Sequence, residues 1–489
     1  MSRFNSSHNQ KRHGVSLRLI ICVVTTIVAI LLAINVLLVV QSSGRQNQKT
    51  DSKHPDGTFN NVPIYLRKSV DFHSSAHCIG ETHNPDTAWM YRSCHFKNLC
   101  FDTSTKDFFL VKGPQEKEFQ QRRKHYPLSF ISTSTVPNDL TLALGGINPR
   151  WNGTDFNQGI HKVKWSPKIV DKPPTEYYML PDTTVFVPFH SLAAHNVGHL
   201  LWDDLYAIYV LLSDFGFLAS EKVLLRVDTL PLLYGTCEMR RKKAQRCAKN
   251  YEKFLPLMGI DPSTFSTAKH AKLSPASPTI ICAKTAVAGL GMLSDHGLKD
   301  HGWNPAAERQ VQNAGKGSML YFFRNFMLHN MGLPLIPSEN NRFRVLLSAH
   351  SSGEPGRDLD FQAQYQRLHS AFPSADVQIV EFAQMSLTEQ ISLTSQSNVF
   401  VSTCGGGAMT ATFLPRGASL VLLYSEQGGF NFANFSLIGG PAFLDWDLFN
   451  NAGYLQVHWL PIGSINSPQG LDSLEYLIRH EMDVATNGI

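Results

Sequence analysis

The chain has 489 residues, of which 43% are hydrophobic and 17% are charged, and its formal net charge at pH 7 is +5. This length and hydrophobic content allow two or three domains with a large buried core. The weak positive charge suits an anionic small ligand or an acidic polymer, and it excludes the strongly basic composition of a nucleic-acid-binding protein. We therefore expect no nucleic-acid partner.

The first predicted element is a membrane anchor at residues 19–40, which are apolar and carry no charge. About 22 residues at 1.5 Å each match a hydrocarbon core of ~30 Å. Residues 1–18 contain basic side chains and no acidic one, so the positive-inside rule predicts a short cytosolic tail and a lumenal remainder. A cleaved signal peptide is the alternative, although its apolar region is normally only ~7–15 residues long.

A stalk and a small leading module are predicted next. Residues 41–62 are rich in Ser, Gln, Asn, Lys and Gly and contain almost nothing to bury, which is typical of a stalk. Residues 63–125 consist of short segments around three cysteines and end in a charged connector. Further along, Asn152 and Asn434 each begin an Asn-x-Ser/Thr sequon and are candidate glycosylation sites.

The cysteine count agrees with an oxidising lumen. Seven cysteines follow the predicted anchor, and an odd number leaves at least one thiol outside a disulfide. Cys282, in an apolar strand, and Cys404, beside a run of glycines, are the candidates for such thiols. The local spacings favour two bridges, although spacing alone does not fix connectivity, and these would join Cys94 to Cys100 and Cys237 to Cys247.

The region 126–301 alternates strands and helices. Residues 183–190 read as a buried strand, and residues 196–215 have apolar side chains at helical spacing. A second strand, a second helix and a third strand follow at 221–227, 239–258 and 279–289. This alternation predicts a parallel α/β layer, which we expect to be an N-terminal Rossmann-like domain.

The region 339–489 shows a cleaner alternation, after a linker at 302–338 that contains one helix near residues 320–328. Predicted strands and helices succeed one another at 343–352, 361–372, 375–383, 386–396, 399–401, 408–414 and 420–423. Ser386 and Glu389 form a capping box at the start of the fourth of these. The series predicts a second Rossmann-like domain, so the fold class is α/β with two such domains facing a cleft in which a ligand sits.

A glycine-rich turn lies within the second domain. Gly405, Gly406 and Gly407 come between a buried strand and a helix that is predicted to begin at Ala408. Such a turn presents backbone N–H groups, and its glycines let a ligand approach the main chain closely. Phosphate is the anion that these sites most often bind, whereas a tight turn required only by packing is the alternative.

A polar cluster in the first domain is the main candidate for catalysis. His195, His199 and Asp203 recur every four residues and share one helical face, and His190 ends the preceding strand. Strand C-termini line the ligand crevice of α/β sheets, where a histidine acts as a general base or as a donor to phosphate. The alternatives are a core histidine with solvated carboxylates, or a zinc site, for which no third ligand is evident and which Asn196 disfavours because it replaces the expected Glu.

Three further features are weaker. Arg357 follows the strand at 343–352, where it would bind a diphosphate or be a solvated loop residue. Asp445 and Asp447 form a D-x-D triplet of the kind that holds a divalent ion on a nucleotide sugar, but two surface acids are the usual explanation. The basic residues at 240–249 indicate a solvated helix face, with an acidic polysaccharide partner as the alternative.

Four stretches together resemble glycosyltransferase family 61, which includes plant xylan arabinosyl- and xylosyltransferases and animal O-linked N-acetylglucosaminyltransferases. They are RSCHFKNLC at 92–100, HNVGHLLWDDLYAIYVLL at 195–212, the strand followed by Arg357, and NVFVSTCGGGAMTATFLPRGASLVLLY at 398–424, in which FLPRGA is the most specific. The resemblance implies a GT-B fold with two Rossmann-like domains, a nucleotide-sugar donor and inverting transfer to a hydroxyl.

The same resemblance implies roles for the candidate residues. His195, His199 and Asp203 would face the acceptor, while Arg357 and the loop 404–407 would face the nucleotide. The chain departs from the family pattern in two places: Cys404 begins a Cys-Gly-Gly sequence where His-Gly-Ala is common, and no arginine directly follows the strand at 343–352.

The sequence thus predicts a type II glycosyltransferase of the Golgi or ER membrane. We expect a UDP-linked donor, a glycan or glycoprotein acceptor, and no metal or other cofactor. His199 or His195 would remove the acceptor proton, and Arg357 with the N–H groups of residues 405–408 would stabilise the diphosphate. The alternatives are a metal-dependent GT-A-type transferase that uses Asp445 and Asp447, and a non-catalytic lumenal glycan-binding protein.

Overall fold

The computed structural model separates residues 1–63 from a compact unit at 64–489, and every residue described below belongs to that unit. The described residues are 72–79, 92–105, 107–112, 130–131, 140–149, 160–191, 194–219, 222–226, 241–262, 279–289, 316–338, 342–349, 359–424, 449 and 452–487. No helix within these ranges is long and apolar enough to span a bilayer. The predicted anchor at 19–40 and the predicted stalk at 41–62 lie outside them.

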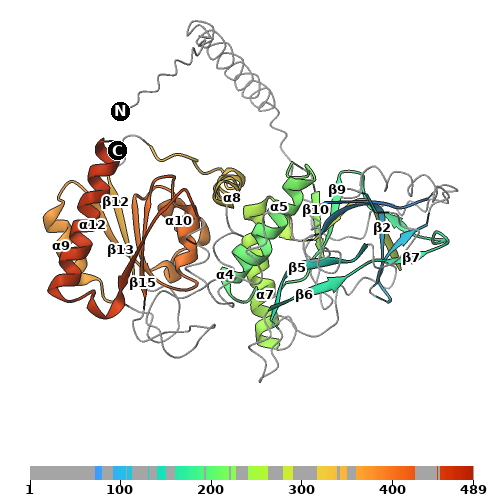
Figure 1. Cartoon of the computed structure of the whole chain (residues 1–489), viewed down its shortest axis with the longest axis horizontal. Coiled ribbons are helices and arrows are strands. Elements are labelled where there is room, and N and C mark those ends of the chain that lie inside the picture. The colour runs from blue at the N-terminus through green and yellow to red at the C-terminus, as the bar shows by residue number, and fades with distance from the viewer. Residues whose placement is uncertain are drawn as a thin grey trace, which may run out of the picture. The chain divides into compact units, whose positions relative to one another are not determined.

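The described elements before residue 190 are strands, and strands and helical segments largely alternate after that point (Figure 1). The strands are β1 (Ser75–Ile79), β2 (Ser93–Asp102), β3 (Asp107–Val111), β4 (Phe130–Ile131), β5 (Leu142–Pro149), β6 (Ile160–Trp165), β7 (Lys168–Val170), β8 (Tyr178–Met179), β9 (Thr184–Pro188), β10 (Lys222–Arg226), β11 (Ile280–Ala288), β12 (Arg344–Ser348), β13 (Asp376–Val380), β14 (Val399–Thr403), β15 (Ser419–Tyr424) and β16 (Gln456–Pro461). The helical segments are α4 (Val197–His199), η4 (Leu200–Leu205), α5 (Tyr206–Asp214), α7 (Arg241–Phe254), η5 (Leu255–Met258), α8 (Lys316–Asn330), α9 (Gln362–Ala371), η8 (Phe382–Gln384), α10 (Leu387–Thr394), η9 (Ala408–Phe413), η10 (Ile462–Ser464) and α12 (Pro468–Asn487).

The first sheet has nine strands and is mixed, whereas the sequence predicted a parallel layer. Its main path runs β10-β9-β11-β2-β1-β4. The β10/β9 and β9/β11 pairs are parallel, but β2 pairs antiparallel with β11, β1 and β3. The connection from β2 to β3 is only a short turn, and a short turn can join only antiparallel neighbours. The strands of the predicted leading module at 63–125 are therefore part of the same sheet as β9, β10 and β11.

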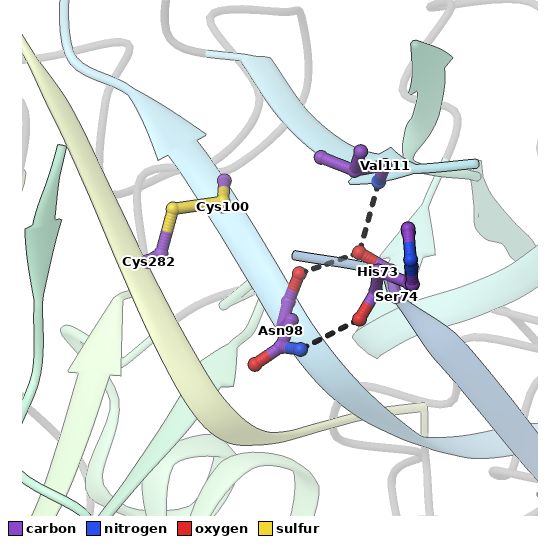
Figure 2. The surroundings of a disulfide bond; sticks show 6 residues. All are labelled: His73, Ser74, Asn98, Cys100, Val111 and Cys282. Atoms are coloured by element: carbon purple, nitrogen blue, oxygen red, sulfur yellow. Dashed lines mark hydrogen bonds between the residues drawn. A yellow bond between two sulfur atoms is a disulfide. The ribbon is translucent and has the colours of Figure 1, made fainter. Parts of the chain in front are cut away.

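The disulfides differ from the predicted local bridges. Cys78 is bonded to Cys94, because the two lie directly opposite in an antiparallel register. Cys100 is bonded to Cys282 for the same reason (Figure 2). A bond between Cys94 and Cys100 is excluded, since both lie in β2 and six residues of strand separate them by roughly 20 Å. The prediction that Cys282 is a thiol was also wrong.

The remaining cysteines are only partly described. Cys404 keeps its thiol, as predicted. Cys247 is disulfide-bonded, but Cys237, the partner predicted for it, lies outside the described residues. The sequon residues Asn152 and Asn434 also lie outside them.

A small network of hydrogen bonds links strands of the first sheet beside the Cys100–Cys282 bond. Asn98 has a positive φ of 56° in the middle of β2, and its side-chain amide donates to the carbonyl of His73 at 2.6 Å. Ser74 Oγ donates to the carbonyl of Asn98 at 2.7 Å and accepts from the N–H of Val111 at 2.9 Å (Figure 2). These bonds join the segment before β1 to β2 and β3.

The second sheet is wholly parallel and has the order β13-β12-β14-β15-β16. Its two faces are covered by different helices (Figure 1): α9 and α12 pack on the face that carries Val345 and Val401, and α10 packs with η9 on the face that carries Leu346. The capping box at the start of α10 is confirmed, because Ser386 Oγ accepts from the N–H of Glu389 and the Glu389 carboxylate accepts from the N–H of Ser386. This part of the sequence prediction, a Rossmann-like alternation of strands and helices, agrees with the structure.

The largest apolar core includes side chains from both the helices after β9 and the second sheet. The ring of Phe323 in α8 lies 5.3 Å from that of Tyr206 and 5.2 Å from that of Tyr209. The next residue of α8, buried Arg324, donates from Nε to the carbonyl of Phe413 at 3.1 Å. The helix predicted in the linker, α8, therefore packs against α5 and against η9.

Candidate functional site

The helix that carries the predicted catalytic residues contains a π-helical segment. The Asn196 side chain caps its start by accepting from the N–H of Gly198 at 3.0 Å. After α4, the backbone hydrogen bonds in η4 join residues five positions apart, as in a π-helix. The ordinary α-helical pattern resumes in α5. Such insertions are rare, and they frequently lie at functional sites. Here the segment contains both Asp203 and Asp204, and both are buried.

His199 and Asp203 form a hydrogen-bonded dyad. His199 Nδ1 lies 2.6 Å from Asp203 Oδ2, and the side chains are 19% and 1% exposed respectively. An ionised carboxylate only accepts hydrogen bonds, so it holds the Nδ1–H tautomer and leaves the lone pair on Nε2. The partly exposed imidazole is thus oriented by a buried acid, which is the arrangement of a histidine that acts as a general base.

Asp204 serves a second, separate network. Its Oδ2 accepts from Ser191 Oγ and from the Tyr251 hydroxyl, each at 2.5 Å. Burial, followed by the adjacent Asp204 charge, raises the pKa of Tyr251, which keeps the phenol protonated as a donor. Asn250, the preceding residue in α7, donates to the carbonyl of Ala194 at 2.8 Å. Helix α7 therefore bonds directly to Ala194, the neighbour of His195, and it shares the acceptor Asp204 with Ser191.

His190 lies near these residues in sequence but belongs to the core. It is 5% exposed, and burial lowers its pKa to about 4. Within the described part of the chain its Nε2 atom has no hydrogen-bond partner. His190 is thus a neutral, buried histidine, in contrast to the partly exposed side chains of His195 and His199.

The glycine turn follows β14 directly. Gly405 has a φ of 123°, a conformation that other residues rarely adopt. The N–H of Cys404 donates to the carbonyl of Leu423 at 3.1 Å, and the N–H of Ala408 donates to the carbonyl of Gly405 at 3.0 Å. These two N–H groups of the predicted phosphate site are therefore used within the protein.

Two glycines of the turn retain available donors. The backbone N–H groups of Gly406 and Gly407 have no acceptor among the described residues. The helix after the turn begins at Ala408 as predicted, but it is a six-residue 3₁₀ helix, η9, rather than an α-helix. Its short length gives it a weak dipole, so an anion would depend on direct contact with the turn.

The turn lies at the topological switch point of the second sheet. The chain passes from β12 to β13 on one side and then crosses back to β14 on the other, so the C-terminal ends of β12 and β14 are neighbours. Open α/β sheets bind ligands at this position. The segment after β12 that contains Arg357 lies outside the described residues.

The glycine turn lies close to the start of the helix that carries the dyad. A Cβ atom placed on Gly406 would lie 3.6 Å from Asn196 Oδ1, and one placed on Gly198 would lie 3.3 Å from Met409 Cγ. The first turn of the His199 helix is therefore packed directly against residues 406–409. The structure brings together two of the groups that the sequence predicted as separate halves of one site.

Some predicted residues cannot be placed, and others were missed. Asp445 and Asp447 lie outside the described ranges, within which no three His, Cys, Asp or Glu side chains gather as metal ligands would. Asn196, Ser191 and Tyr251 were not predicted as part of the site. The adjacent acids at 203 and 204, in an otherwise apolar helix, were the signal in the sequence that a buried polar network is present.

No protein-family model and no curated protein matches the chain. Among solved structures, the chain is similar to the heptosyltransferase WaaC of E. coli with ADP-2-deoxy-2-fluoro heptose, at 9% identity and a TM-score of 0.26, and to WaaC with ADP, at 10% identity and the same TM-score. Both alignments cover 61% of this chain and 99% of the other. At such a TM-score the likeness carries no argument, and the function is inferred from the site itself.

Proposed function

We propose that the protein is a glycosyltransferase that moves a sugar from a nucleotide-sugar donor to a hydroxyl of a glycan or glycoprotein, with inversion. One observation carries the proposal: the glycine turn at the switch point of the second sheet lies against the first turn of the helix that holds the His199–Asp203 dyad. A phosphate-binding turn and an oriented base in contact are what sugar transfer from a nucleotide diphosphate requires.

The donor diphosphate binds at the glycine turn. The N–H groups of Gly406 and Gly407 supply donors, and neither residue has a side chain that would keep a phosphate away from the backbone. Arg357 follows β12, whose C-terminal end neighbours that of β14, so we assign it the bidentate contact with the diphosphate. The nucleotide is UDP, as the resemblance to family 61 implies.

His199 is the general base. Its Nε2 atom takes the proton of the acceptor hydroxyl while that oxygen attacks the anomeric carbon of the donor sugar. The bond between that carbon and the phosphate oxygen breaks, and its electron pair leaves with the diphosphate. Asp203 stabilises the imidazolium that forms, through the bond at 2.6 Å. A single displacement of this kind inverts the anomeric centre. His195 faces the acceptor beside His199.

The leaving group requires no bound metal in this proposal, because backbone N–H groups and Arg357 balance its charge. The rival is a metal-dependent transferase that uses Asp445 and Asp447. Chelation separates the two: we expect full transfer activity in excess EDTA, whereas a loss that Mn²⁺ or Mg²⁺ restores would favour the rival.

The proposal includes a lumenal location, in a Golgi or ER membrane protein with a single anchor at residues 19–40. The apolar, uncharged sequence of that segment supports it. The Cys78–Cys94 and Cys100–Cys282 disulfides also support it, because such bonds persist in the secretory pathway and are rare in the cytosol.

The test is a panel of labelled nucleotide sugars, offered to the purified full-length chain with neutral and acidic oligosaccharide acceptors. We expect one UDP-sugar to bind and to be transferred or slowly hydrolysed. If no nucleotide sugar binds or reacts while an oligosaccharide does bind, the enzyme proposal fails and the protein is a lumenal glycan-binding protein.

A further inference from the structure

The exposed side of α7 carries a row of cations. Lys242, Arg246, Lys249 and Lys253 are all exposed and follow one another at intervals of four, three and four residues. This spacing places side chains on one face of a helix. At a rise of 1.5 Å per residue, the row is about 16 Å long. These four residues are called the basic row below.

Among the described residues, no carboxylate forms an ion pair with the basic row, although Glu252 is exposed beside it. Other exposed cations of the protein behave differently, because Lys168, Lys284 and Arg367 each pair with a carboxylate. Like charges four residues apart destabilise a helix, so the row opposes the stability of α7 unless an anion occupies it.

The opposite face of α7 is fixed to the candidate active site. Cys247, Tyr251 and Phe254 are buried, and the Tyr251 hydroxyl donates to Asp204 in the helix that carries the dyad. Asn250, next to Lys249, donates to the carbonyl of Ala194, which precedes His195. An anion held on the basic row would therefore stand in a fixed relation to the loop that contains His195.

The residues exposed on α7 favour a polyanionic ligand that has no apolar part. A helix that lies on a membrane exposes large apolar side chains for insertion, but the described apolar side chains of α7 are buried or half-buried. Single-stranded nucleic acids are bound by exposed aromatic residues that interleave with cations, and the exposed positions of α7 contain no aromatic residue among those described. Evenly spaced carboxylates or sulfates on a flexible chain fit the row best.

We propose that the basic row binds an acidic polysaccharide and that the acceptor of this protein is a glycan of that class, with carboxylate or sulfate groups. The inference rests on the proposed transferase function and names the acceptor of the same site. The acidic groups contact the row while a nearby sugar of the same chain presents its hydroxyl to His199. A solvated face with no partner is the explanation that the experiment must exclude.

The test measures binding of two matched probes to the full-length chain. One probe is an oligomer of galacturonic acid, and the other is the same oligomer with every carboxylate methyl-esterified, which removes the charge and keeps the backbone. We expect the acidic oligomer to bind, with an affinity that falls as salt is raised, and the esterified oligomer to bind at least roughly tenfold more weakly, as the loss of several exposed ion pairs implies.

Two variants with equal charge changes locate the site. The triple variant Arg246→Gln, Lys249→Gln and Lys253→Gln should weaken binding of the acidic oligomer by roughly tenfold. The control, Lys97→Gln, Lys172→Gln and Arg342→Gln, also removes three exposed charges and should leave binding within about twofold. Equal losses in the two variants, or equal binding of the two probes, would overturn the proposal.

Two further measurements separate this inference from its rivals. UDP-sugar binding by the triple variant should be unchanged, so a chain that binds a UDP-sugar but no acidic oligomer retains the proposed function and refutes the acceptor class. Vesicles of phosphatidylcholine with and without phosphatidylserine test the membrane alternative. If the triple variant loses only its preference for phosphatidylserine, the row is a membrane contact and the proposal fails.

Discussion

Asp203 and Asp204 are adjacent in the chain and both are buried, yet they hold different neighbours. Asp203 meets His199, whereas Asp204 accepts from Ser191 and Tyr251. Successive residues of a helix point about 100° apart, so one acid reaches along its own helix and the other reaches outward to α7. The first orients the proposed base, and the second keeps that base's helix in place.

The dyad makes a prediction about catalysis. His199→Gln and Asp203→Asn should each lower kcat by about 10²–10⁴, the usual contribution of a general base, because one removes the base and the other its orientation. The double variant should lose little more than either single one, since the two residues act as a unit. Steady-state kinetics with the active UDP-sugar measure this, together with the Kd for UDP, which should not change.

His195→Gln is the matched control for this prediction. We expect a smaller loss of kcat, because the hydrogen bond to Asp203 orients His199, the proposed base. A loss at His195 that equals or exceeds the loss at His199 would move the role of the base to His195.

His190 makes a prediction about acid stability. Its pKa is lowered from 6.5 to about 4 by burial. Well above pH 6.5 the imidazole is neutral in both the folded and the unfolded chain, so its protonation does not reduce the free energy of unfolding. As the pH falls from 6.5 toward 4 the unfolded chain binds a proton that the folded chain does not, so the free energy of unfolding decreases by up to about 3 kcal/mol.

Urea unfolding at pH 7.5 and pH 4.5 checks this for the wild type and His190→Gln. The variant should be less stable at pH 7.5 but should lose less on acidification. The difference between the two proteins isolates His190 from other titrating groups such as His95, whose pKa burial also lowers. Equal losses in both proteins would show that His190 does not titrate as its burial requires.

At the scale of elements, the helix with the π-helical segment starts close to the glycine turn, and both the segment and the turn have irregular backbone. The segment buries two acids that an ordinary surface helix would expose, and the turn needs the positive φ of Gly405. Irregular backbone of this kind costs stability and is frequent at functional sites. The contact between Asn196 and the turn joins the two irregularities.

Tyr251→Phe tests whether α7 supports the π-helical segment. A hydrogen bond to a buried charged group contributes about 1.5–3 kcal/mol, so we expect the free energy of unfolding to fall by about 2 kcal/mol. Tyr365→Phe in α9 is the control, because the Tyr365 hydroxyl makes no hydrogen bond to the described residues. Chemical denaturation measures both, and similar stabilities for the two variants would show that the Tyr251 bond does not support the fold.

Gly405 and Gly406 should respond differently to the same substitution. Gly405→Ala forces a side chain into a φ of 123° and should cost about 1–3 kcal/mol of stability. Gly406→Ala meets its nearest neighbour at an ordinary 3.6 Å and should be tolerated. Its methyl group stands where the diphosphate approaches, so UDP affinity should fall by roughly tenfold or more. Titration calorimetry and thermal unfolding measure the two effects, and unchanged UDP affinity in Gly406→Ala would exclude the turn as the phosphate site.

Local sequence patterns predicted some elements and missed others for physical reasons. The period of apolar residues and the Ser386–Glu389 box were sufficient for the parallel second sheet and α10, since both are local signals. The pairing of β2 with β11 joins Cys100 to Cys282 across 182 residues, and nothing local encodes such a partner. His195, His199 and Asp203 were proposed as site residues because they recur at a fixed interval in the sequence. Tyr251 was not proposed, because it belongs to a different helix.

At the scale of the whole molecule, the site depends on packing between the first helices and the second sheet. The apolar core that they share includes Leu200 and Phe400. In helix α8, Phe323 packs against Tyr206, and the neighbouring buried Arg324 donates from its guanidinium to Phe413 at the end of η9. The relation between the dyad and the glycine turn is therefore set by a continuous core as well as by the direct contact at Asn196.

Backbone amide hydrogen exchange of the full-length chain, with and without UDP, tests the central claim most directly. The account predicts that UDP slows exchange in the peptide that contains Gly406 and Gly407, and that Gly406→Ala abolishes this protection. Failure of UDP to bind, or binding that protects other segments and leaves the glycine turn unchanged, would contradict it.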